Sequence, residues 1–469
     1  MALKLYNSLS KEIEIFEPLE KGVVLMYNCG PTVYDYAHVG NFKSFLLADS
    51  LRRYLEYLGY KVKQVMNITD VGHLVADVDS GDDKIEARAK KVKKTPEEVG
   101  AFYTKAFFED LSKLNILAAN AYPRASDFIS EMQEIIMILL KKGHAYKVGK
   151  NIYYAVSSFP DYGKLSGNSL ESLKSGARVE INPEKKDPAD FALWVEDKKH
   201  VMGWQSPWGS HGYPGWHIEC SAMSHSVLGC TTLDIHTGGE DNKFPHHECE
   251  IAQSEAFTKK PFSKYFIHSS FLLINGQKMS KSLGNCYTLA ELEQKGFMPY
   301  AVRFALMSGH YRQNLNLTFD SLRAASEAMK KIQDHIFTLL ASKHGTAEAK
   351  KEIIMFLREF EFSLDDDLNF PMCLGAVFKF FEEISKKRLT LEAKLKVIEV
   401  LKRTNHVLGL KLDWEIKTPM AILKLKAERE KLRSMGLFKK SDEIRDKMQR
   451  LGYEIRDTDD GTVVFKCIK

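Results

Sequence analysis

The first clear pattern in the chain is the apolar run Val23–Met26, which is followed by an amphipathic stretch over 42–60 and a strand-like segment over 61–67. A strand, a helix of about five turns and a second strand in this order predict a β-α-β unit that opens a parallel sheet. Two later strand-like segments, 231–237 and 265–275, indicate that the α/β pattern resumes much further along the chain.

Other patterns divide the rest of the chain. Helical periodicity predicts helices near 98–115 and 126–143, whereas 151–208 contains short strand-like pieces, loops and most of the tryptophans. Periodic apolar positions then predict a mainly helical region over 320–410. The tail shows helical spacing over 421–451 and ends in the strand-like "TVVFKCI".

This order predicts an α/β domain with an insertion, a helical bundle and a small C-terminal module. We place the α/β domain at residues 1–320, with the insertion at about 120–208 and a distinct loop region at about 265–320. The bundle is placed at 321–412 and the small module at 413–469.

Composition adds a charge asymmetry and an expected compartment. Net charge is +5, and 421–469 contains 13 basic and 9 acidic residues, so a polyanion partner or a solvated helix face explains the tail. The N-terminus has charges where a signal peptide needs an apolar segment, and no apolar run reaches the roughly 18 residues that cross a bilayer. The seven cysteines are odd in number and scattered, which is typical of a reducing compartment. We therefore expect a cytoplasmic protein with no membrane partner.

The loop after the first apolar run ends in His38-Val39-Gly40-Asn41 and leads into the amphipathic stretch. Gly40 lets a ligand approach the backbone, and the unpaired amides of a helix start favour anions. A histidine there can donate a proton to a phosphate oxygen as charge develops. The alternative is a capping turn with an incidental histidine.

A second motif, "GQKMSKSLGN" over 276–285, follows the apolar run Phe271–Ile274. Lys278 and Lys281, with serines between and beside them, form a cationic loop that can close over a triphosphate and stabilise a leaving pyrophosphate. A solvated loop would explain the charges alone. The exact pentapeptide Lys-Met-Ser-Lys-Ser downstream of a His-x-Gly-x turn favours the first interpretation.

Together the two motifs resemble the "HIGH" and "KMSKS" elements of class I aminoacyl-tRNA synthetases. The surrounding sequence is similar to cysteinyl-tRNA synthetases over nearly the whole chain, in "CGPTVYDYAHVGN", "DFALW", "SPWG", "GWHIECSAMS", "DIHTGGEDNKFPHHECEIAQSEA", "DDDLNFP" and "DEIRDKM". This resemblance implies a Rossmann-type catalytic domain with a parallel sheet and an inserted connective subdomain. An α-helical bundle and a small C-terminal anticodon-binding module would follow it.

Four residues could hold a metal. His246 and Glu250 are four apart, on one face of a helix expected to begin after Pro245, and Cys29 and Cys220 lie near glycines. Two thiolates, an imidazole and a carboxylate suit Zn²⁺, although a single cysteine is more often a buried apolar residue than a ligand. The resemblance places all four residues at the zinc site of the family.

The resemblance also implies the reaction. ATP, with Mg²⁺, and L-cysteine would give cysteinyl-adenylate and pyrophosphate, and cysteine would pass to the 3′-terminal adenosine of tRNA(Cys), which carries a GCA anticodon. The substrate thiolate would join the zinc, whereas a serine hydroxyl is a poor, hard ligand.

Residue roles follow from the same resemblance. Catalytic roles are implied for His38, Asn41, Lys278 and Lys281. The ATP site would add Gly40, Gly238, Gly239, Asp241 and Ser280, and the cysteine pocket would comprise Cys29, Thr32, Trp216 and His246.

The sequence departs from the family at two positions. Asn41 replaces the second histidine of the "HIGH" element, and it can bind a phosphate but cannot act as an acid. Cys249 stands where asparagine is common, and we hypothesise that it is a bystander rather than a further zinc ligand. The acidic segment 70–88 does not fit the EF-hand spacing, and we expect a hydrated surface loop.

Two other functions remain open. A cysteine:amino-sugar ligase shares the catalytic core but should lack the basic tail, and a non-catalytic tRNA-binding paralogue should lose zinc ligands or the lysine loop. We expect a monomer whose bundle supports the anticodon arm. Its tail would bind RNA phosphates through Arg429, Arg433, Lys439, Lys440, Arg445 and Arg450.

Overall fold

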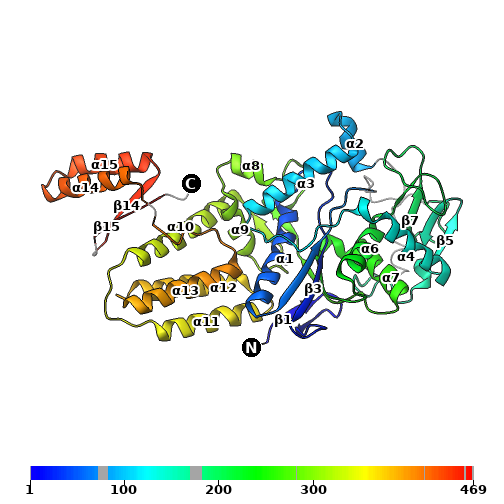
Figure 1. Ribbon diagram of the computed structural model, residues 1–469, viewed down its shortest axis with the longest axis horizontal. Coiled ribbons are helices and arrows are strands. Elements are labelled where there is room, and N and C mark those ends of the chain that lie inside the picture. Colours follow the sequence, from blue (N-terminus) through cyan, green and yellow to red (C-terminus); the bar gives the residue numbers. More distant parts are fainter. Residues whose placement is uncertain are drawn as a thin grey trace.

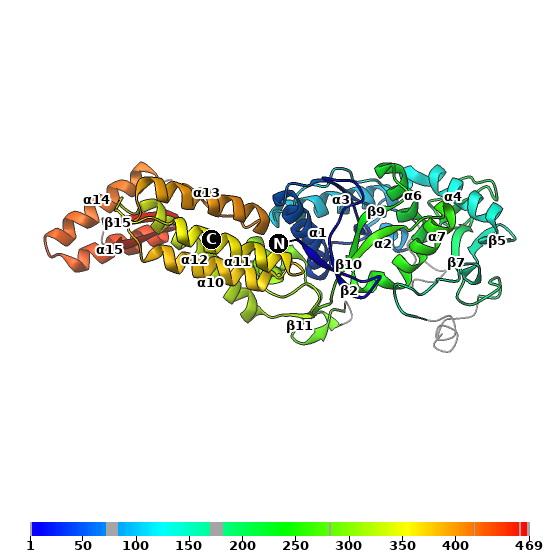
Figure 2. The ribbon, with the colours of Figure 1, turned by 90° about the horizontal axis from the view of Figure 1, so that it is seen from below.

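The protein is an elongated molecule, with a sheet-containing body at one end, a helical bundle in the middle and a small module at the other end (Figures 1 and 2). The computed structural model describes residues 2–71, 83–168, 182–280, 283–416, 418–458 and 461–466. Within them the expected fold class is confirmed: an α/β sheet domain with an inserted subdomain precedes a helical region.

The central sheet has four parallel strands in the order β10-β9-β3-β4. The predicted β-α-β unit is confirmed as β3 (Val23–Asn28), α1 (Val39–Tyr57) and β4 (Lys61–Met66). The later strands are β9 (Leu233–Gly239) and β10 (Ser263–Ser269).

Each face of this sheet is covered by its own core. Val24, Met26 and Ile235 pack with α1 on one face, whereas Tyr27 and Val65 pack with other helices on the opposite face. Those helices are α4 (Ile129–Lys142), α6 (Trp216–Leu228) and α7 (Glu248–Thr258). Because both faces are covered, ligand access is left to the carboxyl edge of the strands.

The strand-like segment 265–275 is divided between two sheets. The chain leaves the central sheet after β10, where the Ser270 amide donates to the Tyr311 carbonyl oxygen. It then forms β11 (Leu272–Ile274), which pairs with β12 (Gln277–Lys278) and with β13 (Leu315–Leu317) in a separate sheet. The pairing with β13 spans about 40 residues and leaves no local signal in the sequence.

The inserted subdomain contains a four-stranded antiparallel sheet. Its strands are β5 (Ala145–Val148), β6 (Asn151–Tyr154), β7 (Phe191–Glu196) and β8 (Gly212–Pro214). Before it, α3 (Pro96–Lys113) and α4 confirm two predicted helices.

Helix α2 (Lys84–Val92) was not expected. Much of the acidic segment 70–88 lies outside the described residues, but from Asp83 onward a helix replaces the expected loop. The Asp83 carboxylate accepts hydrogen bonds from the amides of Ile85 and Glu86, and this cap starts the helix.

The remaining elements complete the chain. The bundle consists of α10 (Phe319–Ala341), α11 (Lys350–Asp365), α12 (Phe370–Ser385) and α13 (Leu391–Leu408). The tail forms α14 (Met420–Ser434), α15 (Phe438–Arg450), β14 (Tyr453–Thr458) and β15 (Gly461–Lys466), with Gly436 in a left-handed conformation between the two helices. Short elements elsewhere are β1 (Lys4–Asn7), β2 (Glu12–Ile15), α8 (Leu289–Gln294) and α9 (Pro299–Met307).

A buried charged cluster joins the sheet domain to the bundle. Arg303 of α9 is fully buried, and its guanidinium donates to the Asp49 carboxylate at 2.7 Å and to the Leu408 carbonyl oxygen, at the end of α13, at 3.0 Å. Arg53 donates to the same carboxylate at 2.9 Å and to the His406 carbonyl oxygen at 2.7 Å. Helix α1 is therefore tied to α13 by charged hydrogen bonds.

Replacing Arg303 by methionine is expected to lower the free energy of unfolding by about 3 kcal/mol, because it removes one partner of a buried ion pair and leaves carbonyl oxygens unpaired. The unfolding midpoint in urea, followed by tryptophan fluorescence, measures this effect. Arg323→Met is the matched control, because its exposed ion pair with Asp320 should change stability by less than about 0.5 kcal/mol. Equal midpoints for Arg303→Met and the unmodified protein would contradict the assigned role of the cluster.

Candidate active site

The predicted site residues gather at the carboxyl edge of the parallel sheet. Cys29 directly follows β3, and Gly238 and Gly239 end the neighbouring strand β9. Gly30 is packed so closely on β4 that a Cβ there would lie 1.7 Å from the Asn67 carbonyl oxygen, so only glycine fits. This packing turns the chain sharply after β3 and fixes the position of Cys29.

Four side chains converge beside this turn. The Sγ atoms of Cys29 and Cys220, a ring nitrogen of His246 and a carboxylate oxygen of Glu250 all lie within 4.8 Å of one another. Cys220 lies one turn into α6, and His246 lies in the short helical segment Lys243–His247, which continues directly into α7. His246 Nε2 is 2.8 Å from Glu250 Oε1, so the expected proximity of these two side chains holds.

Two spacings in this cluster fit a small tetrahedral metal ion, whereas the 2.8 Å between His246 Nε2 and Glu250 Oε1 is a hydrogen-bond distance. Bonds of about 2.0–2.3 Å to a central zinc place neighbouring ligand atoms about 3.5 Å apart. Cys220 Sγ is 3.5 Å from His246 Nε2, and Cys29 Sγ is 3.8 Å from Glu250 Oε1. The two sulfurs, one nitrogen and one oxygen are donors typical of a zinc site.

The electrostatics of the cluster are set by burial and by close charge partners. Burial favours neutral Glu250, but the imidazoles of His246 and His236 outweigh it and hold the pKa of this carboxyl well below its usual value. Burial and the hydrogen bond to Cys220 raise the pKa of the Cys29 thiol well above its usual value. Burial also opposes ionisation of Cys220, but hydrogen bonds from Cys29 and His246 lower the pKa of its thiol to about 7. The cluster thus already holds a carboxylate and a readily ionised thiol.

Sequence reasoning missed a second set of possible ligands. Ligand atoms of Cys29, His236, His247 and Glu250 also lie within 4.8 Å of one another. His236 Nε2 is 2.5 Å from Glu250 Oε2, and His247 Nε2 is 3.2 Å from Cys29 Sγ. The adjacent histidines of "FPHHECE" and the histidine of "DIHTGG" were the available signals, but spacing alone did not show that His236 contacts Glu250 and His247 contacts Cys29.

The second ring nitrogens of the candidate ligand histidines also have close contacts. His217 Nδ1 is 2.9 Å from His246 Nδ1, and His268 Nε2 is 2.9 Å from His247 Nδ1. His236 Nδ1 is 3.1 Å from the Tyr27 carbonyl oxygen. Such contacts to the second ring nitrogen orient a histidine that binds a metal, and they are a regular feature of metal sites.

Cys249 lies away from both sets of ligands. Its buried Sγ is 3.3 Å from the Tyr162 hydroxyl, and burial raises the pKa of its thiol. Among the described residues it belongs to neither group of converging ligand atoms. This placement agrees with the hypothesis that Cys249 is a bystander.

Two expected pocket residues lie near the cluster in different ways. Trp216 starts α6, and its ring stacks on His246 with centroids 4.4 Å apart and planes at 23°. Thr32 lies in the loop after Cys29 and pairs with Thr69 through a parallel bridge. Thr69 in turn donates from its hydroxyl to buried Glu219, the residue before Cys220. Trp216 thus forms an aromatic wall against the cluster, and Thr32 lines the same turn.

His38 and Asn41 form the cap of helix α1. The Asn41 amide donates to His38 Nδ1 at 3.2 Å, and the His38 amide donates to Asn41 Oδ1 at 3.0 Å. The helix therefore begins at Val39, three residues before the predicted start. Since Nδ1 accepts a hydrogen bond, the proton of a neutral His38 ring is on Nε2. The capping turn is real, and it sets the tautomer of the His38 ring.

The lysine loop lies directly against this helix start. A Cβ on Gly40 would lie 2.0 Å from Cε of Met279, so the two motifs are in contact. The Asn285 side chain brackets the loop, accepting from the Ser280 amide at 2.8 Å and donating to the Lys278 carbonyl oxygen at 3.0 Å.

Of the two lysines in this loop, the structure describes only Lys278. Lys278 Nζ lies 4.3 Å from the centroid of the Phe271 ring. Lys281 lies outside the described residues, so its position stays a prediction.

The glycines at the end of β9 have little space around them. A Cβ on Gly238 would lie 2.7 Å from the His247 ring, and one on Gly239 would lie 2.4 Å from the Asp241 carboxylate. The Gly239 amide donates to Asn242 Oδ1 at 2.8 Å. This tight turn holds the Asp241 carboxylate against Gly239 at the end of β9.

One expected RNA-binding cation is wrongly assigned. Arg429 is buried and makes a bidentate ion pair with Asp457, with both N–O distances 2.8 Å, so its guanidinium is already used inside the module. Exposed positions of α14 and α15 carry the other five candidates: Arg433, Lys439, Lys440, Arg445 and Arg450.

Comparisons with known proteins bear on this site. Residues 15–327 match the family described as tRNA synthetases class I (C) catalytic domain, and residues 359–413 match the DALR domain. The chain is 43% identical to the cysteine–tRNA ligase of Chlorobium chlorochromatii, over 99% of each chain, and 41% identical to one from Thermus thermophilus, over 98% of each.

Solved structures agree on the fold. Mycobacterium tuberculosis methionyl-tRNA synthetase in complex with methionyl-adenylate superposes with a TM-score of 0.58 at 12% identity, over 83% of this chain and 87% of that one. A putative arginyl-tRNA synthetase from Campylobacter jejuni gives 0.55 at 11% identity, over 86% and 95%. Within the described residues, no helix has the length and apolar character needed to span a bilayer.

Proposed function

The chain belongs to the cysteine–tRNA ligase family, and we propose that it selects cysteine through a zinc ion held by Cys29, Cys220, His246 and Glu250. As an ATP-dependent tRNA ligase it must distinguish cysteine from serine, which differ by one atom of similar shape. The observation that carries the proposal is the convergence of these four ligand atoms within 4.8 Å at the edge of the catalytic sheet.

The donor set explains the choice of amino acid. When bound, zinc would accept the substrate's thiolate as a ligand far more readily than a serine hydroxyl, which stays protonated. A pocket that reads shape alone separates such similar side chains poorly. The protein's own contribution is to hold the four ligands together, with Cys29 half-buried, the other three buried and the ring of Trp216 beside them.

The ATP phosphates would be bound by the two adjacent motifs, the His38–Asn41 helix start and the lysine loop. His38 Nε2 would donate to an ATP phosphate at the start of α1, assisted by the positive end of the helix dipole and by Asn41. Lys278, Ser280 and Lys281 would close from the opposite side over the pyrophosphate, which Mg²⁺ accompanies. Gly40, Gly238, Gly239 and Asp241 would line the nucleotide. Contact between Gly40 and Met279 supports this pairing of the motifs.

A cysteine between these two groups is held at both ends. Cys29 and Thr32 lie in the turn that precedes His38 by six to nine residues, so one loop serves the thiol and the carboxylate ends of the substrate. Attack of the carboxylate on the α-phosphorus gives cysteinyl-adenylate, and a hydroxyl of the 3′-terminal adenosine then takes the acyl group. Both steps depend on orientation and charge stabilisation rather than on a protein nucleophile.

We also propose how the protein binds tRNA, its domain bounds, its oligomeric state and its cellular location. The tail would bind the GCA anticodon arm of tRNA(Cys) through its exposed cations, with the bundle as support. The domains would divide at 1–320, 321–412 and 413–469. The protein would act as a cytoplasmic monomer.

Two assays of the metal-loaded protein test the proposed function. Cysteine should trigger ATP–pyrophosphate exchange and serine should not, and removal of zinc by a chelator should abolish exchange until Zn²⁺ is restored. A tRNA transcript with a GCA anticodon should then be charged. Exchange without charging would favour a cysteine:amino-sugar ligase, and no exchange at all would favour a non-catalytic paralogue.

A further inference from the structure

An exposed aromatic pair stands at the rim of the active site. Tyr36, two residues before His38, and Phe102 of α3 are 43% and 46% exposed, although both are large aromatic side chains. Their ring centroids are 6.1 Å apart, and both rings pack edge-to-face on buried Tyr103 at 5.1 Å. We call Tyr36, Phe102 and Tyr103 the rim aromatics. Tyr103 anchors the other two, whose remaining surface faces solvent.

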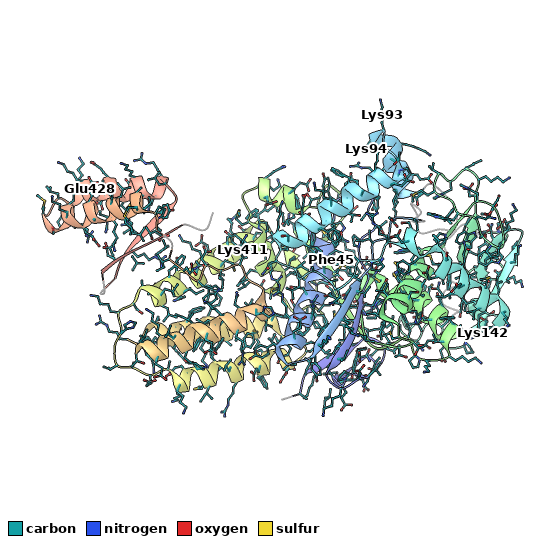
Figure 3. All side chains as sticks on the ribbon, in the orientation of Figure 1. Phe45, Lys93, Lys94, Lys142, Lys411 and Glu428 are labelled. Carbon is teal, nitrogen blue, oxygen red and sulfur yellow. The ribbon has the colours of Figure 1, made fainter. Side chains whose placement is uncertain are left out.

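Cations surround the rim aromatics. Lys94 Nζ lies 5.3 Å from the centroid of the Phe102 ring, and the Arg88 guanidinium donates to the Tyr103 hydroxyl at 2.8 Å and lies 3.7 Å from the Asp35 carboxylate. Exposed lysines continue to the end of α2 and the turn after it, at positions 90, 91, 93 and 94. Figure 3 shows Lys93 and Lys94 projecting from the far end of this helix. The rim is therefore both aromatic and basic.

Helix α2 is held between the active-site loop and the inserted subdomain. The Glu86 carboxylate accepts from the Val201 amide at 2.6 Å and lies 2.9 Å from His200 Nδ1. On its other side, Arg88 reaches Asp35 in the loop that leads to His38. Because α2 is anchored on both sides, the rim aromatics have a fixed position beside the start of α1, where the phosphates are expected.

This combination of groups matches single-stranded RNA better than duplex RNA. Bases of a duplex are already stacked on one another, whereas unpaired bases at an end can stack on aromatic rings while lysines and arginines bind the phosphates. An acidic protein would satisfy the lysines but would not require two exposed rings. The RNA segment that must reach this site in a tRNA ligase is the single-stranded 3′ end.

We propose that the rim aromatics and Lys94 bind the unpaired 3′ nucleotides of the tRNA, with a base stacked on the exposed face of Phe102 or Tyr36. The inference rests on the proposed function, since it requires that tRNA is the acyl acceptor. Stacking here would hold the strand while its terminal adenosine enters the site between Cys29 and His38. Lys90, Lys91 and Lys93 extend the phosphate-binding surface away from the site.

Phe102→Leu tests the proposal, because it keeps an apolar side chain but removes the ring. Loss of one stacked base should lower kcat/KM for tRNA charging about tenfold, and cysteine-dependent pyrophosphate exchange should change much less. Tyr36→Leu should show the same split. Phe108→Leu is the matched control, because Phe108 is an exposed aromatic on the same helix that packs instead on Tyr122 at 4.8 Å.

A binding assay identifies the RNA segment. Phe102→Leu should weaken binding of full-length tRNA, but it should not alter binding of a tRNA that lacks its last three nucleotides. Lys94→Ala should lower the salt dependence of full-length binding by about one counterion, compared with Lys105→Ala on α3.

Two results would overturn the proposal: normal charging by both leucine variants, or equal weakening of binding to the full and truncated tRNAs. Absence of exchange in the unmodified enzyme would instead refute the proposed function itself.

Discussion

A Cys220→Ser enzyme is expected to lose its zinc and to lose cysteine-dependent pyrophosphate exchange by about a thousandfold or more. The pKa of the Cys220 thiol is lowered to about 7, so this thiol ionises readily. The serine hydroxyl that replaces it stays protonated and binds zinc poorly. A loss of about 4 kcal/mol of substrate binding corresponds to a thousandfold. Metal content of the purified protein and exchange at several cysteine concentrations measure the effect.

Cys249→Ser is the matched control for this experiment. It changes the same atom in a residue that is equally buried, but its Sγ contacts the Tyr162 hydroxyl rather than the cluster. It should keep both zinc and exchange activity. Loss of zinc in Cys249→Ser would show that this residue is not a bystander.

The same series separates the two overlapping ligand sets. Cys220 belongs only to the set with His246, whereas His247 belongs only to the set with His236. If zinc survives in Cys220→Ser but is lost in His247→Gln, the metal is held by the second set and the proposed assignment is wrong.

A His38→Ala enzyme is expected to form cysteinyl-adenylate about 10²–10³-fold more slowly, because it loses a preorganised donor to the charge that develops on the phosphates. It should also lose about 1 kcal/mol of stability, since His38 Nδ1 caps helix α1. Single-turnover adenylate formation and the unfolding midpoint measure the two effects separately.

His38→Asn distinguishes catalysis from capping. Asparagine is a strong helix cap, so this variant should recover the stability that alanine loses. It should remain as slow as His38→Ala, because the donor that the imidazole places at Nε2 is absent. An active His38→Asn enzyme would reduce His38 to a capping residue.

The helices and strands that were predicted correctly are those with a clear periodic pattern of apolar residues in their own sequence. The β-α-β unit, α3, α4 and the helical region were found because their apolar positions repeat at the period of a helix or lie in a short apolar run. The break between β10 and β11 was missed, because it depends on pairing with β13, which is distant in sequence. Helix α2 was missed because charged residues dominate it and only a few positions, such as Ile85 and Ala89, face inward.

The candidate site was predicted unevenly for similar reasons. Glu250 and His246 are close in sequence, and Cys29 and Cys220 were placed by family resemblance, so all four could be proposed before their convergence was visible. His236 and His247 were not singled out, because their contacts to Glu250 and Cys29 depend on how α7 packs against β9 and β3. Arg429 was assigned to RNA on charge alone, and its burial against Asp457 could not be seen in the sequence.

We propose that the zinc ion binds the sulfur of the substrate cysteine directly. X-ray absorption at the zinc edge of the metal-loaded protein tests it most directly, because it counts the sulfur neighbours of the metal. We expect two sulfur neighbours, from Cys29 and Cys220, in the free enzyme and three after addition of cysteine, with no change after serine. A count that cysteine leaves unchanged would contradict the account.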